Sequence, residues 1–240
     1  MSLLRFENVH KAFGGLKALD GVSISLEAGC MTGLIGPNGS GKTTLLNVLS
    51  GNLAPDQGDV IFDGRSIVGL QPSAIARRGV GRMFQITRLF RRLSTLDNLV
   101  TSGCAFGLSF HDALDRAERL IEELELTAVH DEDGGNLSGG QQKLLEFGSV
   151  FMGAPKIAVL DEPFAAIHPH MREVMVRFIR ERHAEGHGFL IVSHDLPVVL
   201  GLTDDLIAMN AGQVVARGDA DTVLHDPLVI EAYLGETAVS

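Results

Sequence analysis

One segment constrains the fold of this chain more than any other: residues 36–44 read Gly-Pro-Asn-Gly-Ser-Gly-Lys-Thr-Thr. The mainly apolar run 31–35 comes before it, and Leu45 and Leu46 follow. This order predicts a strand, a glycine loop and the start of a helix. Such a loop turns consecutive backbone N–H groups around phosphate oxygens, and the helix dipole adds partial positive charge. The segment therefore predicts a phosphate site in an α/β fold.

The loop residues have separate expected parts in this site. Lys42 is expected to neutralise charge on the β- and γ-phosphates, and the Thr43 hydroxyl is expected to ligate Mg²⁺. The residues expected to contact the nucleotide are Gly36, Pro37, Asn38, Gly39, Ser40, Gly41, Lys42, Thr43 and Thr44.

A second candidate element is the carboxylate pair Asp161 and Glu162. It follows residues 157–160 (Ile-Ala-Val-Leu), which are apolar at every position, as in a strand buried on both faces of a parallel sheet. Carboxylates at the carboxyl end of such a strand face the ligand crevice. We expect Asp161 to hold Mg²⁺, directly or through water, and Glu162 to accept the proton of the attacking water or to orient it. Taken alone, the pair could equally be a solvated strand end.

A third motif, residues 136–142 (Asn-Leu-Ser-Gly-Gly-Gln-Gln), separates one class of phosphate-loop protein from the rest. Ser138, 23 residues before Asp161, is expected to cap a helix whose first-turn N–H groups, with the Ser138 hydroxyl, point outward at an anion. Such a helix start can bind a second phosphate group. With these three motifs the chain resembles the ATP-binding-cassette (ABC) ATPases over essentially its full length.

The resemblance implies a fold, cofactors and an assembly. The fold is α/β, a P-loop NTPase of the ABC type with a small antiparallel β subdomain and a helical subdomain. The implied cofactors are ATP and Mg²⁺. Members of the family act as head-to-tail dimers, in which the phosphate loop of one subunit and the segment 137–141 of the other enclose ATP. The residues of that segment expected at the nucleotide are Ser138, Gly139, Gly140 and Gln141.

Three single positions also match the family. Phe13 lies where an aromatic ring stacks on adenine, Gln85 matches the glutamine that links Mg²⁺ and water to the helical subdomain, and His194 matches the switch histidine on the γ-phosphate. The resemblance therefore implies two overlapping sets of functional residues. The catalytic set is Glu162, His194 and Gln85, and the metal-ligating set is Thr43, Gln85 and Asp161.

The chain also departs from the family pattern. His168 stands where an acid or amide is usual, and we expect it to cap a helix or lie on the surface. Phe13 replaces the commoner tyrosine, which keeps the stacking surface and removes the hydroxyl. Residues 143–149 lack the Ala-Arg pattern that is frequent after the third motif, a change with no mechanistic explanation in the sequence.

We expect one ABC ATPase domain over residues 1–240. Its core and β subdomain are expected at 1–86 and 151–240, with two or three short strands in the first thirty residues. The helical subdomain, which carries the third motif, is expected at 87–150. Within residues 111–133, nine acids and helically spaced apolar residues predict an amphipathic helix with an acidic outer face.

Composition excludes several classes. Apolar residues form 45% of the 240 and charged residues 21%, a globular mixture. A membrane-spanning helix needs about 20 predominantly apolar residues, whereas the longest uninterrupted apolar run has four. The amino terminus lacks the pattern of a secretory signal, so a cytosolic location is expected. The net charge of −10 argues against a general nucleic-acid binder. Cys30 and Cys104 are expected to be free thiols.

The single uninterrupted cassette favours transport over repair, chromosome-holding or translation-associated machines. The implied partners are integral-membrane permease subunits, a second ABC ATPase subunit of the same or a related chain, and an extracytoplasmic solute-binding protein, with no nucleic acid. Such subunits, typical of bacterial importers, lie peripherally on the cytoplasmic face of the inner (plasma) membrane. Residues 72–92 hold six arginines and no acid. This basic run is either a solvated face or the surface beside Gln85 that meets the permease.

Short matches separate two kinds of transporter. The segments that resemble ATP-binding subunits of branched-chain amino-acid importers are 13–19, 81–90 and 232–235. Those shared with the lipopolysaccharide-exporter ATPase are 77–79, 90–94 and 162–165. We favour import of branched-chain amino acids or a related small polar solute. The alternatives are the exporter and a soluble cassette acting on nucleic acid, while residues 138–141 disfavour a small GTPase or kinase.

Overall fold

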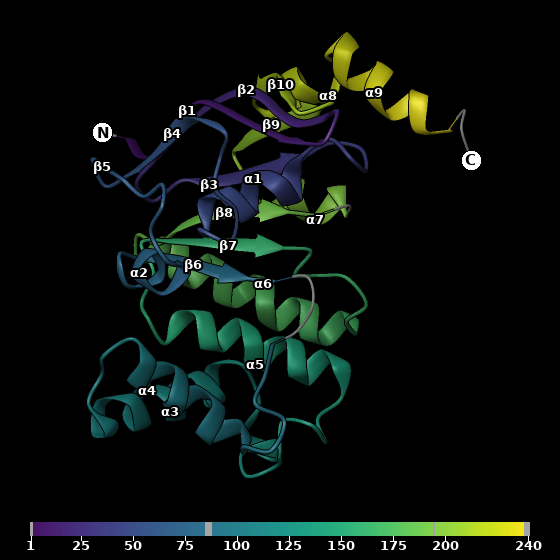
Figure 1. The fold of residues 1–240 in the computed structure, drawn as a ribbon. Coiled ribbons are helices and arrows are strands. Elements are labelled where there is room, and N and C mark those ends of the chain that lie inside the picture. The colour runs from purple at the N-terminus through teal and green to yellow at the C-terminus, as the bar shows by residue number, and fades with distance from the viewer. Residues whose placement is uncertain (1, 85–87, 194, 238–240) are drawn as a thin grey trace.

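The computed structural model describes residues 2–84, 88–193 and 195–237. Two sheets organise these residues (Figure 1). The smaller sheet is antiparallel, with strand order β2-β1-β4-β5. Its strands are β1 (Ser2–Phe13), β2 (Leu16–Glu27), β4 (Gln57–Phe62) and β5 (Arg65–Ser66). The expected antiparallel β subdomain is thereby confirmed.

The first thirty residues differ from the prediction of two or three short strands. They form two strands of 12 residues each, β1 and β2, which pair as a hairpin closed at residues 14–15. The register of this pair shifts at several points, for example between Phe6 and Val9. Irregularities of this kind break the strict alternation of apolar and polar residues without ending the strand. The sequence pattern therefore suggested shorter pieces.

The larger sheet has the order β10-β9-β3-β8-β7-β6 and is parallel except for β10. Its strands are β3 (Met31–Ile35), β6 (Val80–Met83), β7 (Ile157–Asp161), β8 (Gly188–Val192), β9 (Asp205–Asn210) and β10 (Gln213–Gly218). Every residue of β3, β7 and β8 is buried, as predicted for strands covered on both faces. The carboxyl ends of β3 and β7 carry the glycine loop and the carboxylate pair.

Helices cover both faces of the larger sheet (Figure 1). Helix α1 lies between the two sheets, where Leu45 and Leu49 join one apolar core. Helices α5 and α6 cover the opposite face and form a second core. The other helices around the two sheets are α2, α7, α8 and α9. These helices have the bounds α1 (Lys42–Leu49), α2 (Pro72–Arg77), α5 (Gly139–Phe151), α6 (Pro169–Ala184), α7 (Leu196–Leu202), α8 (Ala220–Leu224) and α9 (Pro227–Thr237).

Helices α3 (Thr95–Ala105) and α4 (Phe110–Glu123) pack together on the far side of α5 (Figure 1). The helix expected within residues 111–133 is shorter than its charge pattern suggested. It ends at Glu123 because Glu125 has a left-handed backbone, with φ of 55°, and a 3₁₀ turn (Thr127–Val129) follows. Its apolar stripe is buried and its acids lie outward, as predicted.

Three phenylalanine rings fix α5 against α6. Phe147 and Phe151 of α5 meet Phe178 of α6 edge to face, with ring centroids 4.9–5.2 Å apart. Such pairs contribute about 0.5–1.5 kcal/mol each beyond their buried area. The cluster therefore fixes α5, the helix that begins within the third motif, against α6.

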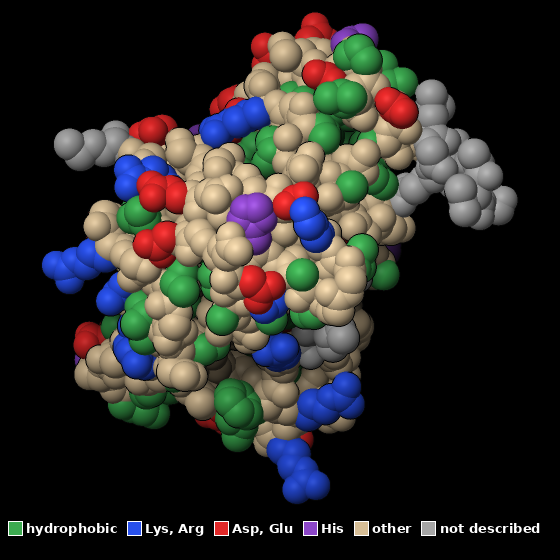
Figure 2. Space-filling model, turned by 45° about the horizontal axis from the view of Figure 1, so that its top comes forward, with side chains coloured by type: hydrophobic (Ala, Val, Ile, Leu, Met, Phe, Trp, Pro, Cys, Tyr) green, Lys and Arg blue, Asp and Glu red, His purple; other side chains and the backbone are tan. Residues whose placement is uncertain are grey.

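The surface agrees with the composition. Figure 2 shows acidic and basic side chains interspersed over most of one face, with Lys and Arg more frequent along its lower edge. Cys30 and Cys104 are free thiols, as expected. Within the described ranges, no helix is both long and apolar enough to cross a membrane.

Candidate active site

The glycine loop, residues 36–41, joins β3 to α1 and leaves no room for side chains at its two ends. A Cβ on Gly36, where φ is 146°, would lie 2.2 Å from the Met209 carbonyl oxygen. A Cβ on Gly41, where φ is 105°, would lie 2.5 Å from the Ala18 carbonyl oxygen. Only glycine fits both the space and the backbone conformation. The loop shape is therefore set by its neighbours in the fold.

Lys42 places its charge at the centre of this loop. The side chain is buried, and Nζ donates to the carbonyl oxygens of Gly36 at 2.7 Å and Pro37 at 2.9 Å. A third contact reaches Ser40 Oγ at 3.3 Å. A cation held inside a ring of backbone groups suits a phosphate oxygen, because a charge-assisted contact is shorter and stronger than a neutral one.

Asp161 ends β7 next to Arg82 of β6. Its carboxylate is buried, and Arg82 Nη2 lies 3.5 Å from Asp161 Oδ2. Burial raises the pKa of Asp161, and the positive charges of Arg82 and Lys42 oppose that rise. The nearby cations therefore offset only part of the cost of burying the negative charge of Asp161. A carboxylate in this situation is a favourable ligand for a hard divalent ion.

Glu162 has a strained backbone that turns the chain sharply after β7. Its φ is 52°, in the left-handed region that costs a non-glycine residue about 1–3 kcal/mol. The Glu162 N–H donates to the Val192 carbonyl oxygen at 2.9 Å. The Ser193 hydroxyl donates to Glu162 Oε2 at 3.3 Å. Strand β8 and its end therefore hold both the backbone and the side chain of this residue.

These elements meet around one cavity of about 380 Å³. Among the sequence-predicted residues, those lining it are Phe13, Asn38, Gly39, Ser40, Gly41, Lys42, Thr43, Thr44, Asp161 and Glu162. Gly36 and Pro37 form the start of the same loop. A volume of this size suits a small-molecule ligand. The Thr43 hydroxyl and the Asp161 carboxylate supply oxygen donors of the type that Mg²⁺ prefers, so the residues fit a nucleotide with its magnesium ion.

Phe13 is the last residue of β1 and is 51% exposed. Lys11 Nζ lies 5.8 Å from the centre of its ring. An exposed aromatic ring at the mouth of a phosphate cavity offers a flat apolar surface to a base.

The third motif lies apart from this cavity. Ser138 caps α5 as predicted, since its hydroxyl accepts the Gln141 N–H and the Gln141 side chain accepts the Ser138 N–H. The Ser138 hydroxyl also donates to Gln141 Oε1 at 2.8 Å. These reciprocal bonds form a capping box, and the Ser138 residue stays exposed at the start of the helix. Among the described lining residues of the glycine-loop cavity, none comes from 138–141.

Two predicted catalytic residues, Gln85 and His194, lie outside the residues that the structure describes. His168 has the capping role that we expected. It is the N-cap of α6, and its Nδ1 accepts the His170 N–H at 3.3 Å.

Lys143 is a site residue that the sequence analysis missed. This buried lysine on α5 donates from Nζ to the carbonyl oxygens of Glu162 at 2.7 Å and Ala165 at 2.8 Å. Burial lowers its pKa, and the charges of Glu162 and Glu146 oppose that effect. The only indication in the sequence was a lysine near the start of a helix, followed by the apolar pair 144–145. That pattern does not identify the carbonyl groups that Lys143 contacts in the folded chain.

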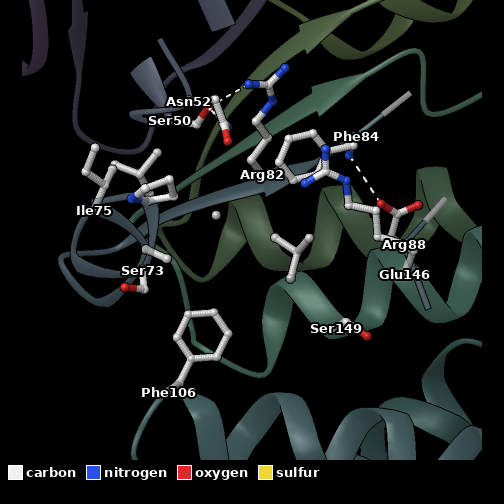
Figure 3. A pocket seen from close by; sticks show the side chains of 15 residues that line it. Ser50, Asn52, Ser73, Ile75, Arg82, Phe84, Arg88, Phe106, Glu146 and Ser149 are labelled. Atoms are coloured by element: carbon white, nitrogen blue, oxygen red, sulfur yellow. Dashed lines mark hydrogen bonds between the residues drawn. The ribbon is translucent and has the colours of Figure 1, made fainter. Parts of the chain in front are cut away.

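A second cavity, of about 340 Å³, lies among α2, β6 and α5 (Figure 3). Arg88 stacks on the Phe84 ring with its guanidinium carbon 3.8 Å from the ring centre. The Phe84 N–H donates to Glu146 Oε1 at 3.3 Å. The lining side chains labelled in Figure 3 also include Ile75 and Phe106, which give the cavity an apolar wall.

Arg82 is an exception in the basic run 72–92, whose other five arginines are exposed as expected. The Arg82 side chain is only 6% exposed. Its Nη1 donates to Leu46 O at 2.8 Å and to Ser50 Oγ at 2.6 Å. A run of like charges in the sequence does not reveal such buried contacts, because the partners are residues that are distant in sequence and close only in the folded chain.

Comparison with known proteins decides the family. A family model described as "ABC transporter" matches residues 19–165. The chain belongs to the ABC transporter family. It is therefore an ATPase, and the α/β fold class predicted for it is confirmed. A second model, described as "Branched-chain amino acid ATP-binding cassette transporter", matches residues 213–239.

Curated relatives cover nearly all of this family member. A probable branched-chain amino acid transport ATP-binding protein LivG of Methanocaldococcus jannaschii is 39% identical, covering 98% of each chain. The high-affinity branched-chain amino acid transport ATP-binding protein BraF of Pseudomonas aeruginosa is 34% identical, again covering 98% of each. The lipopolysaccharide export system ATP-binding protein LptB of Escherichia coli is 35% identical over the same shares.

Solved structures agree with this assignment. A nucleotide-free ATP-binding cassette from an ABC transporter has a TM-score of 0.87 at 38% identity, covering 97% of this chain and 99% of its own. The ADP conformation of the cassette MJ1267 has a TM-score of 0.85 at 39% identity, covering 98% and 99%.

Proposed function

We propose that this ABC ATPase powers the import of branched-chain amino acids, or of a related small polar solute, through separate membrane permeases. The observation that carries the proposal is the match of residues 213–239 to the branched-chain amino-acid family model. The relatives named for branched-chain amino-acid transport include archaeal and bacterial proteins. The lipopolysaccharide-export relative is similar in identity to the bacterial ones, but the C-terminal match favours the importer.

We propose the following roles for the residues at the cavity. The loop N–H groups and Lys42 bind the phosphates, and the Thr43 hydroxyl and Asp161 carboxylate hold Mg²⁺. The ion, when bound, supplies positive charge for the phosphate oxygens. Glu162 orients the attacking water and accepts its proton as the bond to the γ-phosphate breaks, giving ADP and phosphate. Phe13 stacks on adenine.

The remaining roles belong to the same proposal. Gln85 and His194 stay predicted members of the catalytic set. Residues 87–150 form the helical subdomain, and residues 138–141 reach the nucleotide of a second ATPase subunit in a dimer. Their position away from the cavity of their own chain supports an action across the dimer interface.

The cavity among α2, β6 and α5 is proposed as the docking site of a permease segment (Figure 3). It combines an apolar wall with the Arg88 guanidinium, and it lies on strand β6, which pairs with the strand that ends at Asp161. A segment seated there would touch Phe84, the residue before Gln85. We further propose that the chain lies on the cytoplasmic face of the membrane, where its permease holds it.

The test is leucine uptake by cells that lack their own ATPase for this transport. Restoration of uptake by the chain, with no restoration by Lys42→Ala, would support the proposal.

Affinity purification from gently solubilised membranes identifies the partner proteins. Permeases with an amino-acid-binding protein would support import, lipid-transport bridge components would favour the exporter, and nucleic acid without permease would refute transport.

A further inference from the structure

The C-terminal helix α9 reaches back to the glycine loop. It begins after Asp226, whose carboxylate accepts the Leu228 N–H at 2.8 Å. Val229 is buried in the core, whereas Leu228 and Ile230 are about half exposed. Tyr233 follows Val229 by four residues and so lies on the same face of the helix. This face packs towards β9 and β10.

The Tyr233 hydroxyl contacts the first glycine of the loop. The Gly36 N–H donates to Tyr233 Oη at 2.9 Å, across 197 positions of sequence. On its other side Gly36 lies against β9, where a Cβ would meet the Met209 carbonyl oxygen at 2.2 Å. The entry to the loop is thus confined between a strand and a tyrosine, both from the C-terminal part of the chain.

A second hydrogen bond ties the same part of the chain to the far side of the loop. The Gly212 N–H, in the turn between β9 and β10, donates to the Ser40 carbonyl oxygen at 3.0 Å. Residues 206–233 therefore hold the loop at Gly36 and at Ser40. Fixing the backbone of one residue costs about 1–2 kcal/mol of conformational free energy. A loop already held in place has less of that cost left to meet when phosphate binds.

We propose that Tyr233 is a positioning residue that holds the entry of the glycine loop in its phosphate-binding shape, so that α9 sets the affinity for nucleotide. Tyr233 acts through the Gly36 amide and is given no contact with ATP. This goes beyond the proposed transport function, and it rests only on the nucleotide site of the ATPase.

Tyr233→Phe tests the proposal because it removes one hydroxyl and keeps the ring. We expect the Kd for Mg-ATP and the KM to rise about 3- to 10-fold, the loss of one hydrogen bond, with kcat unchanged. The unfolding midpoint without nucleotide should stay at the parental value, while the rise in midpoint on adding ADP becomes smaller. Hydrogen exchange at the Gly36 amide should become faster, because its acceptor is gone.

Two aliphatic truncations on α9 serve as matched controls. Val229→Ala loosens the docked face while keeping the hydroxyl, so it should raise the Kd, and Tyr233→Phe should then add little. Ile230→Ala lies on the exposed face and should leave the Kd unchanged. A parental Kd in Tyr233→Phe would overturn the proposal, as would a lowered midpoint with an unchanged Kd. Failure of the parent to bind ATP would instead overturn the nucleotide site itself.

Discussion

The side chain of Lys143 offers a direct test of how α5 shapes the segment after β7 that contains Glu162 and Ala165. Lys143→Met keeps the length and removes the charge that Nζ brings to the carbonyl oxygens of Glu162 and Ala165. We expect kcat to fall about 10-fold, equivalent to roughly 1.4 kcal/mol. That figure lies within the strain of about 1–3 kcal/mol that the left-handed Glu162 can release once it is no longer held. The Kd for ATP should stay at its parental value, because Lys143 does not line the glycine-loop cavity.

The stability of the variant follows from the same contacts. A hydrogen bond from a charged donor contributes about 1.5–3 kcal/mol, so two contribute roughly 3–6 kcal/mol before opposing terms. The main opposing term is the burial of the Lys143 ammonium, which lowers its pKa. We expect a net loss of about 2 kcal/mol. In a chain of this length that loss lowers the unfolding midpoint by about 4–8 °C.

The assay is steady-state ATP hydrolysis and thermal unfolding of the two methionine variants Lys143→Met and Lys156→Met. Lys156 makes a surface contact with Asp63, at 2.6 Å between Nζ and Oδ2, and both side chains are largely exposed. Its variant should match the parent in both measurements. An unchanged kcat in Lys143→Met would refute the positioning argument, even if the midpoint fell, because the residue would then be structural only.

Three further predictions concern Glu162, Lys42 and a surface histidine, His130. Glu162→Gln should lower kcat about 10²- to 10⁴-fold and retain bound ATP; parental turnover would exclude the general-base role. Lys42→Ala should weaken ATP binding about 10-fold or more, measured by calorimetry, and an unchanged affinity would remove it from the phosphate site. Contact with Asp131 and Glu118 raises the pKa of His130 above 6.5, so its stabilising contribution is complete below that pH and is lost as pH rises through the raised value. The unfolding midpoint of the parent should therefore fall as pH rises through that value, and His130→Gln should show a smaller fall. An equal dependence of the midpoint on pH in both proteins would count against the ion pairs.

Much of this fold could be predicted because its signals are local. The glycine loop, the capped helix start at Ser138 and the apolar strand before Asp161 each depend on residues that are neighbours in sequence. The ends of helices and the lengths of bulged strands were harder to predict from the sequence. The end of α4 depends on the left-handed turn at Glu125, and the length of β1 depends on pairing with both β2 and β4.

The missed residues share a different property. Arg82, Lys143 and Tyr233 each contact backbone groups at least 19 positions away, and for Tyr233 the separation is 197. Nothing in the neighbouring sequence specifies such a partner. A lysine or arginine near a helix is normally interpreted as a solvent-exposed charge, because most residues of these two types lie on the protein surface. Their positions depend on packing that only the folded chain defines.

The contacts of Lys143 also suggest how the third motif can act on catalysis. Helix α5 begins at Gly139, directly after the Ser138 cap, and Lys143 lies about one turn further along. Within that turn the backbone is hydrogen-bonded, so the cap and the lysine move together. In the proposed dimer, nucleotide bound at the Ser138 end of α5 would pull on the Glu162 carbonyl through Lys143. In that dimer, a single turn of helix would join the nucleotide of one site to Glu162, the proposed water-orienting residue of the other site.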